Sequence, residues 1–217
     1  MIKPQDIVVL VKLLSIEKMI SKYRDIYGVG YDFYDLNENL YDTQKFFDFE
    51  SISLLLSIRG LAESINISKS ETSECIKRLH KVGLLSFKNQ KIGEKLELSS
   101  LTWKVNKKSL FKLIVNSFEF FFQTEPKSID LGIPTVFSNE ILKKHLAYSS
   151  PLPFIWPMPG YNSVSGVSID PLYKSVPHAS MNDKYLYEIF SLIDVFRIGS
   201  PREKRIAQTL LEEDFDL

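Results

Sequence analysis

The chain has 217 residues, of which 44% are hydrophobic and 25% are charged, and its formal net charge at pH 7 is zero, an ordinary composition for one large or two modest globular domains. Its single cysteine, Cys75, excludes an intramolecular disulfide framework, and its longest apolar runs are too short to span a bilayer. Pro4, Gln5 and Asp6 lie where a secretory signal would be continuously apolar, so we expect a cytoplasmic protein that makes no membrane contact.

The first predicted element is a long helix that begins near Pro4, since proline fits the first turn of a helix. It should be largely buried and run to about Gly28, because apolar residues occupy several of its faces: Ile7, Val8, Val9, Leu10, Val11, Leu13 and Leu14. An acidic, aromatic stretch without a clean period follows, and we interpret about residues 24–50 as an ordered, irregular insertion. A further helical segment is predicted near Phe49–Leu56.

A short helix, a tight turn and a second helix are predicted between Ser57 and Gly83. The inner face of the first helix consists of Leu61, Ala62 and Ile65. Asn66 suits the left-handed conformation that ends a helix, and Ile67 then returns to the core.

The second helix of this pair is predicted to begin after Ser68, because Ser68 and Glu71 have the spacing of a capping box. Its buried face consists of Thr72, Cys75, Ile76 and Leu79. Its outer face carries a polar stripe of Ser70, Ser73, Lys77 and Lys81. Gly83 ends the helix.

A β-hairpin with a basic tip is predicted next. The first strand covers Leu84–Phe87, the polar segment KNQKIGEK follows, and the alternating residues Lys95–Leu98 form the second strand. Trp103–Val105 either adds to this sheet or returns the chain to the body.

The remaining residues predict a helical and proline-rich half. Asn106 caps a helix over Lys107–Gln123, whose apolar spacing is carried by Leu110, Leu113, Ile114, Ser117, Phe118 and Phe121. Eight prolines between Pro126 and Pro177 favour an ordered, extended arm, with Trp156 packed either on its own domain or in the groove of a partner. Two helices should close the chain, one over Asp183–Ile198 and one from Ser200 to about Glu213.

Charge is unevenly distributed along the chain although its sum is zero. The segment from Lys69 to Lys108 holds ten lysine and arginine residues against four acidic residues, a local charge of +6. The segment from Glu17 to Ile58 holds four basic residues against eight acidic ones. A segregated basic segment is typical of a phosphate-binding surface, although solvated surfaces without a partner also show it.

The stretch LAESINISKSETSECIKRLHKVGLL resembles the winged helix-turn-helix of MarR-like and related bacterial transcriptional regulators, and the resemblance covers residues 57–95. The matching positions are Leu61, Ala62, Ser68, Ser70, Ser73, Arg78, Leu79, Gly83 and Leu84. The resemblance implies a mainly α fold with a small β wing. Together with the predicted elements, it leads us to expect a winged helix-turn-helix domain over residues 1–105 and a helical, proline-rich domain for dimerisation or partner binding over residues 106–217.

Two glutamates depart from this resemblance. Glu71 and Glu74 occupy positions where such regulators often carry neutral or basic residues, and a carboxylate near DNA phosphates is repulsive. The capping box accounts for Glu71, whereas nothing in the sequence accounts for Glu74.

We therefore expect a homodimer that binds double-stranded DNA sequence-specifically as a transcriptional regulator of the repressor type. The recognition helix, about residues 69–81, would enter the major groove, and the basic wing, residues 87–95, would contact adjacent DNA. Serines suit base edges or phosphates, and the basic residues suit phosphates. The predicted DNA contacts are Lys69, Ser70, Ser73, Lys77, Arg78, Lys81, Lys88, Lys91 and Lys95.

The alternative is a protein-interaction module, antitoxin-like or defence-associated, that holds a partner protein through its C-terminal domain. An enzyme is not indicated, because the three histidines, His80, His145 and His178, lack metal-ligand spacing to one another or to Cys75. The glycines are scattered and form no phosphate loop. We predict no catalytic residue, metal or cofactor, and expect His80 on the surface and Cys75 in the core.

Overall fold

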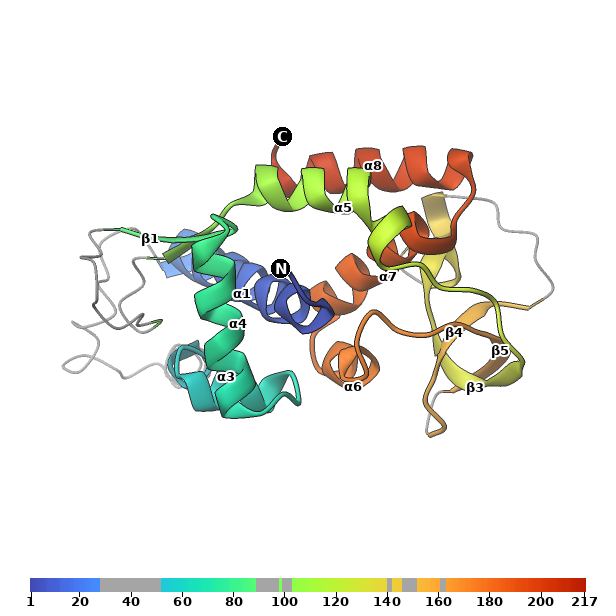
Figure 1. The fold of residues 1–217 in the computed structure, drawn as a ribbon, viewed down its shortest axis with the longest axis horizontal. Coiled ribbons are helices and arrows are strands. Elements are labelled where there is room, and N and C mark those ends of the chain that lie inside the picture. The colour runs from blue at the N-terminus through green and yellow to red at the C-terminus, as the bar shows by residue number, and fades with distance from the viewer. Residues whose placement is uncertain (28–51, 89–97, 99–102, 140–141, 146–151, 161–162) are drawn as a thin grey trace. The chain divides into compact units, whose positions relative to one another are not determined.

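The computed structural model of the chain is mainly helical with two small sheets (Figure 1), and it describes residues 1–27, 52–88, 98, 103–139, 142–145, 152–160 and 163–217. These residues form two compact units. The first holds Val9–Val105, and the second holds Asn106–Leu217 together with Ile2–Val8. Within the described ranges, no helix has both the length and the apolar character needed to cross a bilayer.

The N-terminal helix α1 (Pro4–Tyr27) is the long helix that the sequence predicts. Its apolar residues from Ile7 to Ile16 are fully buried, as expected. Further along α1, the Glu17 carboxylate accepts a 2.7 Å hydrogen bond from the backbone N–H of Val105. From residue 28 onward the predicted insertion lies outside the described residues, and residues 52–55 are helical.

Two helices, α3 (Ile58–Ser64) and α4 (Lys69–Lys81), form the predicted helix, turn and helix of the first unit (Figure 1). Asn66 is left-handed, with φ of 51°, and the Ser68 hydroxyl accepts a 3.3 Å hydrogen bond from the backbone N–H of Glu71. The buried residues of α4 are the predicted ones: Thr72, Cys75, Ile76 and Leu79. Gly83 follows with φ of 76°, a conformation that glycine adopts without a steric penalty.

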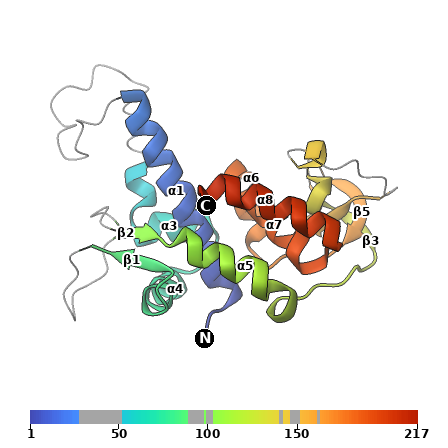
Figure 2. The same cartoon turned by 90° about the horizontal axis from the view of Figure 1, so that it is seen from above.

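The sheet of the first unit pairs β1 (Leu85–Phe87) with β2 (Trp103–Val105) in antiparallel register (Figure 2). Of the two alternatives for Trp103–Val105, the structure shows the first: this segment adds to the sheet as the partner of the first strand. Strand alternation explains the pairing, because Leu85 and Val105 face each other on the buried side while Ser86 and Lys104 face each other on the exposed side. The predicted strand over residues 95–98 lies outside the described residues except for Leu98.

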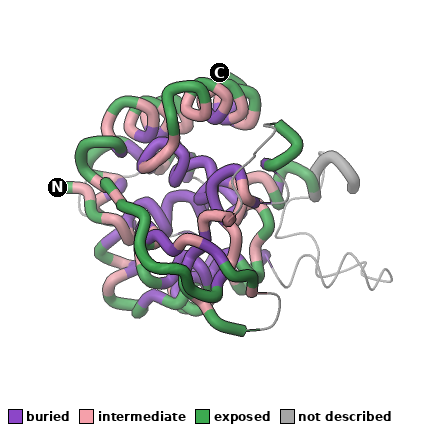
Figure 3. Tube along the Cα trace, turned by 90° about the vertical axis from the view of Figure 1, so that its right-hand side faces the viewer, coloured by how far each residue is buried: buried purple, intermediate pink, exposed green. Residues whose placement is uncertain are grey.

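In the second unit, α5 (Lys107–Phe121) and α8 (Pro201–Phe215) lie side by side and antiparallel (Figures 1 and 2). Ion pairs join them at both ends, Lys107 Nζ to Asp216 Oδ2 at 3.2 Å and Lys204 Nζ to Glu119 Oε2 at 2.9 Å. A capping box between Ser200 and Glu203 starts α8, which buries about one residue per turn (Figure 3): Ala207, Leu211 and Phe215.

The helix α5 begins at the predicted cap, where the Asn106 side chain accepts a 3.0 Å hydrogen bond from the backbone N–H of Ser109. Its buried residues are Leu110, Ile114 and Phe118. Phe121 shares this helical spacing but is 77% exposed, because α5 ends there. Phe120 beside it is 71% exposed.

The proline-rich segment folds into a closed three-stranded sheet, which the sequence did not predict. Its strands are β3 (Ile129–Pro134), β4 (Phe154–Pro157) and β5 (Val164–Ser168). β3 pairs antiparallel with both other strands, and β4 pairs parallel with β5. Gly132 is required where β3 meets β4, because a Cβ atom there would lie 2.0 Å from the Trp156 carbonyl oxygen. The short 3₁₀ turns η3 (Val136–Ser138) and η4 (Lys143–His145) follow β3.

The helices α6 (Val176–Met181) and α7 (Lys184–Ile198) follow β5. The sequence predicted a helix over Asp183–Ile198, and in the structure Asp183 is the cap of α7 and Gly199 follows its last residue. The sequence did not predict α6. The packing of α7 buries an ion pair between Asp194 and Arg197.

Polar side chains from the sheet region converge on this ion pair. Asp194 Oδ2 accepts hydrogen bonds from Thr135 Oγ1 at 2.8 Å and from Trp156 Nε1 at 2.6 Å. Arg197 donates from Nε to the Phe122 carbonyl at 2.7 Å and from Nη1 to the Asp170 carbonyl at 3.0 Å. Burial raises the pKa of the Asp194 carboxyl, and Arg197 together with the hydrogen bonds opposes this effect. Trp156 thus packs on its own unit, where it is fully buried.

Candidate functional site

The outer face of α4 carries the residues that the sequence assigns to the recognition helix. Lys69, Ser70, Lys77 and Lys81 are exposed, and Ser73 is half-buried. The opposite face packs on α3 and β1. One side of α4 is therefore held by the first unit, while the other side presents lysines and serine hydroxyls that can contact an anionic polymer.

Arg78 differs from the other predicted contacts because its side chain is held on α4 itself. Its Nη2 atom lies 2.6 Å from Glu71 Oε1 and 3.3 Å from Cys75 Sγ, and 22% of the side chain is exposed. The structure shows the Ser68 half of the predicted capping box, and the Glu71 carboxylate binds Arg78. Cys75 is fully buried, as expected. Arg78 could reach a phosphate only by leaving Glu71, so we assign it a supporting role in the helix.

Glu74 is exposed on the same face of α4 as the lysines. Its Oε1 atom lies 2.6 Å from Lys77 Nζ, in an ion pair whose side chains are 53% and 62% exposed respectively. Such an exposed pair contributes little stability. Its effect is local, since Lys77 offsets the negative charge that Glu74 places on this face.

The described part of the basic wing contributes one lysine, and the paired strand β2 adds a second. Lys88 is exposed directly after β1, whereas Lys91 and Lys95 lie outside the described residues. Lys104 in β2 is exposed opposite Ser86, and the sequence analysis did not select it. The alternation of buried Trp103, exposed Lys104 and buried Val105 is the signal that identifies it.

His80 connects α4 to the sheet and is half-buried, so the expected surface position holds only in part. Its Nδ1 atom lies 3.1 Å from the Leu85 carbonyl oxygen, which can only accept, so this nitrogen carries the proton. Its ring meets that of Phe87 edge to face, with centroids 5.5 Å apart. His80 therefore helps to fix the orientation of α4 relative to β1.

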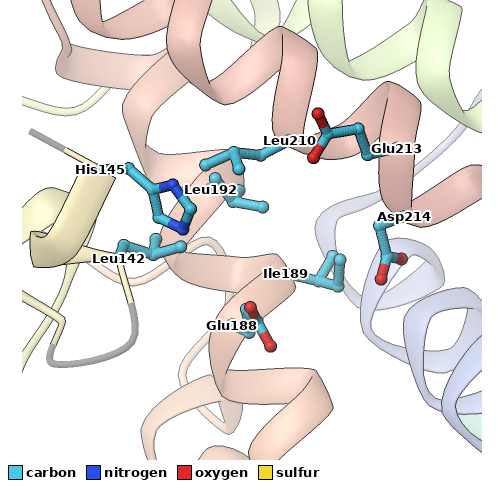
Figure 4. Close-up of a pocket in the computed structure, with 8 residues that line it drawn as sticks. All are labelled: Leu142, His145, Glu188, Ile189, Leu192, Leu210, Glu213 and Asp214. Atoms are coloured by element: carbon cyan, nitrogen blue, oxygen red, sulfur yellow. The ribbon is translucent and has the colours of Figure 1, made fainter.

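The second unit contains a pocket of about 320 Å³ beside η4, α7 and α8 (Figure 4). Four apolar side chains, three acidic ones and one histidine form its lining: Leu142, His145, Glu188, Ile189, Leu192, Leu210, Glu213 and Asp214. Asp214 is engaged, because Tyr185 donates to its Oδ2 atom at 2.6 Å. Burial and the charge of Asp214 raise the pKa of the Tyr185 hydroxyl far above its usual range, so this hydroxyl remains a neutral donor.

Among the described residues, no group of three or more His, Cys, Asp or Glu side chains could hold a metal ion. Comparisons of the chain with known protein families, with curated proteins and with solved structures find no match.

Proposed function

We propose that this chain binds double-stranded DNA as a transcriptional regulator of the repressor type, with α4 in the major groove. The observation that carries this proposal is the two-sided character of α4, whose inner face is buried while its outer face exposes Lys69, Ser70, Lys77 and Lys81. We assign the chain no catalytic residue and no cofactor.

The order of elements in the first unit supports a winged helix-turn-helix as the DNA-binding fold. A capped helix of thirteen residues follows a short helix across a turn at Asn66, and two antiparallel strands come next. In proteins of that fold the second helix reads the groove and the strands lie beside it. Lys88 and Lys104 would then extend the contact to neighbouring phosphates.

The test is the binding of purified protein to a labelled mixed-sequence duplex, measured by fluorescence anisotropy at several salt concentrations. If roughly five to nine phosphates are neutralised, the slope of log affinity against log salt should be about −4 to −8. The lysines between Lys69 and Lys108, the segment with a local charge of +6, supply enough positive charge for that number of contacts. A salt-independent signal, or no binding at low salt, would reject the proposal.

We further propose that the protein acts as a homodimer, because two modules reading a palindromic operator would supply the affinity that one small interface lacks. The observation that favours self-association is the exposure of Phe120 and Phe121 at the end of α5. The same surface would serve the rival role, in which the C-terminal half holds a partner protein.

Light scattering at tens of micromolar should give the mass of a dimer. Replacing both phenylalanines, Phe120→Ser with Phe121→Ser, should yield a monomer of unchanged fold, since neither ring is in the core. Met181→Ser, which removes another exposed apolar side chain of the second unit, should leave the dimer intact. A monomeric mass for the unaltered chain would contradict the homodimer and favour a different partner on this surface.

A further inference from the structure

Glu74 lies in the middle of the exposed stripe of α4. The exposed residues Ser70, Glu74, Lys77 and Lys81 are spaced by four, three and four positions, which aligns them along one side of a helix. The buried residues of α4 occupy other faces of the helix. If α4 enters the major groove as proposed above, Glu74 therefore faces the base edges rather than solvent.

The two glutamates of α4 have different surroundings. Glu71 is partly buried and binds Arg78 at 2.6 Å, which accounts for its presence. Glu74 contacts Lys77 through one oxygen at 2.6 Å and remains 53% exposed. Lys77 lowers the electrostatic penalty of bringing this carboxylate near phosphates and leaves it accessible to a donor from DNA.

A carboxylate only accepts hydrogen bonds, and this limits the base that it can recognise. In the major groove, cytosine presents the N4 amino donor, whereas guanine presents the O6 and N7 acceptors and thymine presents O4. Adenine offers its N6 donor beside the N7 acceptor, which would repel the second carboxylate oxygen. Among the four bases, cytosine suits Glu74 best.

We infer that Glu74 is a specificity-determining residue that selects a cytosine in each half-site of the DNA, with Lys77 holding its carboxylate and compensating its charge. This inference rests on the proposed function, since it assumes that α4 occupies the major groove. It gives Glu74 a role that the sequence alone did not supply.

The experiment selects binding sites from a random duplex library with the full chain and with three variants. The unaltered protein should enrich a consensus that contains a cytosine, and competition with duplexes altered at that position should weaken binding roughly five- to thirtyfold. Glu74→Gln should change the selected base to adenine, because an amide can bond both N6 and N7. Glu74→Ala should make that position degenerate and leave the rest of the consensus unchanged.

Glu119→Gln is the matched control. Glu119 is also 53% exposed and is also paired with a lysine, Lys204, but it lies in the second unit. This variant should select the same sites as the unaltered protein. All variants should keep the same circular dichroism and melting temperature, since both carboxylates are exposed.

The outcomes separate the inference from the proposed function. If Glu74→Gln and Glu74→Ala select the same cytosine as the unaltered chain, the inference is overturned and DNA binding stands. If the unaltered protein binds the library but enriches no consensus, the inference is likewise overturned. If it binds no duplex at all, the proposed function fails and the inference fails with it.

Discussion

Replacing Asp194 with alanine is expected to lower the free energy of unfolding of the second unit by about 3–5 kcal/mol. The substitution leaves the Arg197 guanidinium buried without its ionic partner, and only 4% of that side chain is exposed. It also removes the acceptor for Thr135 and Trp156. A buried charge and buried donors that lose their partner are far more destabilising than the loss of an exposed contact.

Urea unfolding followed by tryptophan fluorescence measures this effect. The chain has two tryptophans, Trp103 in the first unit and Trp156 in the second, so a Trp103→Phe background confines the signal to the indole that contacts Asp194. Emission from Trp156 should also change in the native state, because its hydrogen-bond acceptor is lost.

Asp170→Ala is the control for this prediction. It removes an exposed ion pair with Lys127, at 2.6 Å between Nζ and Oδ2, and should cost at most about 1 kcal/mol. The joint replacement Asp194→Leu with Arg197→Met should be less destabilising than Asp194→Ala, because it leaves no unpaired charge. Equal effects of Asp194→Ala and Asp170→Ala would contradict a structural role for the buried pair.

The helices were predictable because their signals are local. Apolar spacing marks α4, α5, α7 and α8, and the structure confirms the predicted caps Ser68 and Asn106. The structure also shows Asp183 and Ser200 as the caps of α7 and α8. The closed sheet was not predictable in this way. Its strands carry prolines at 134 and 157 and glycines at 132 and 166, which break the alternation that identifies a strand.

Partners that are distant in sequence were also missed. Asp194 accepts from Thr135, 59 positions away, and from Trp156, 38 positions away, so no local pattern connects them. The lysines and serines of α4 could be selected from spacing alone. The ion pairs of α4 could not be selected in this way. Lys77 pairs with Glu74, three positions away, and Arg78 pairs with Glu71, seven positions away. Glu74 is within helical reach of both basic residues, so the choice of partner depends on side-chain geometry.

The double replacement Lys77→Ala with Lys81→Ala is expected to weaken binding to a mixed-sequence duplex by up to about a hundredfold at ~0.1 M salt. Each phosphate contact contributes about −0.9 to the slope of log affinity against log salt. At ~0.1 M salt, the loss of one such contact therefore lowers the affinity roughly tenfold. The slope should therefore fall by about 2 in the double variant. Anisotropy titrations over a range of salt concentrations measure both quantities.

The two single variants should differ, because the ion pair makes the lysines unequal. Lys81→Ala removes one positive charge, whereas Lys77→Ala also exposes the Glu74 carboxylate that Lys77 holds at 2.6 Å. Lys77→Ala should therefore be the weaker binder, and adding Glu74→Ala should recover part of its loss on a mixed-sequence duplex.

The control for the double variant is Lys143→Ala with Lys144→Ala, which removes the same charge from exposed residues of η4 and should leave binding unchanged. Equal losses in both double variants would mean that net charge, and not the face of α4, governs the affinity.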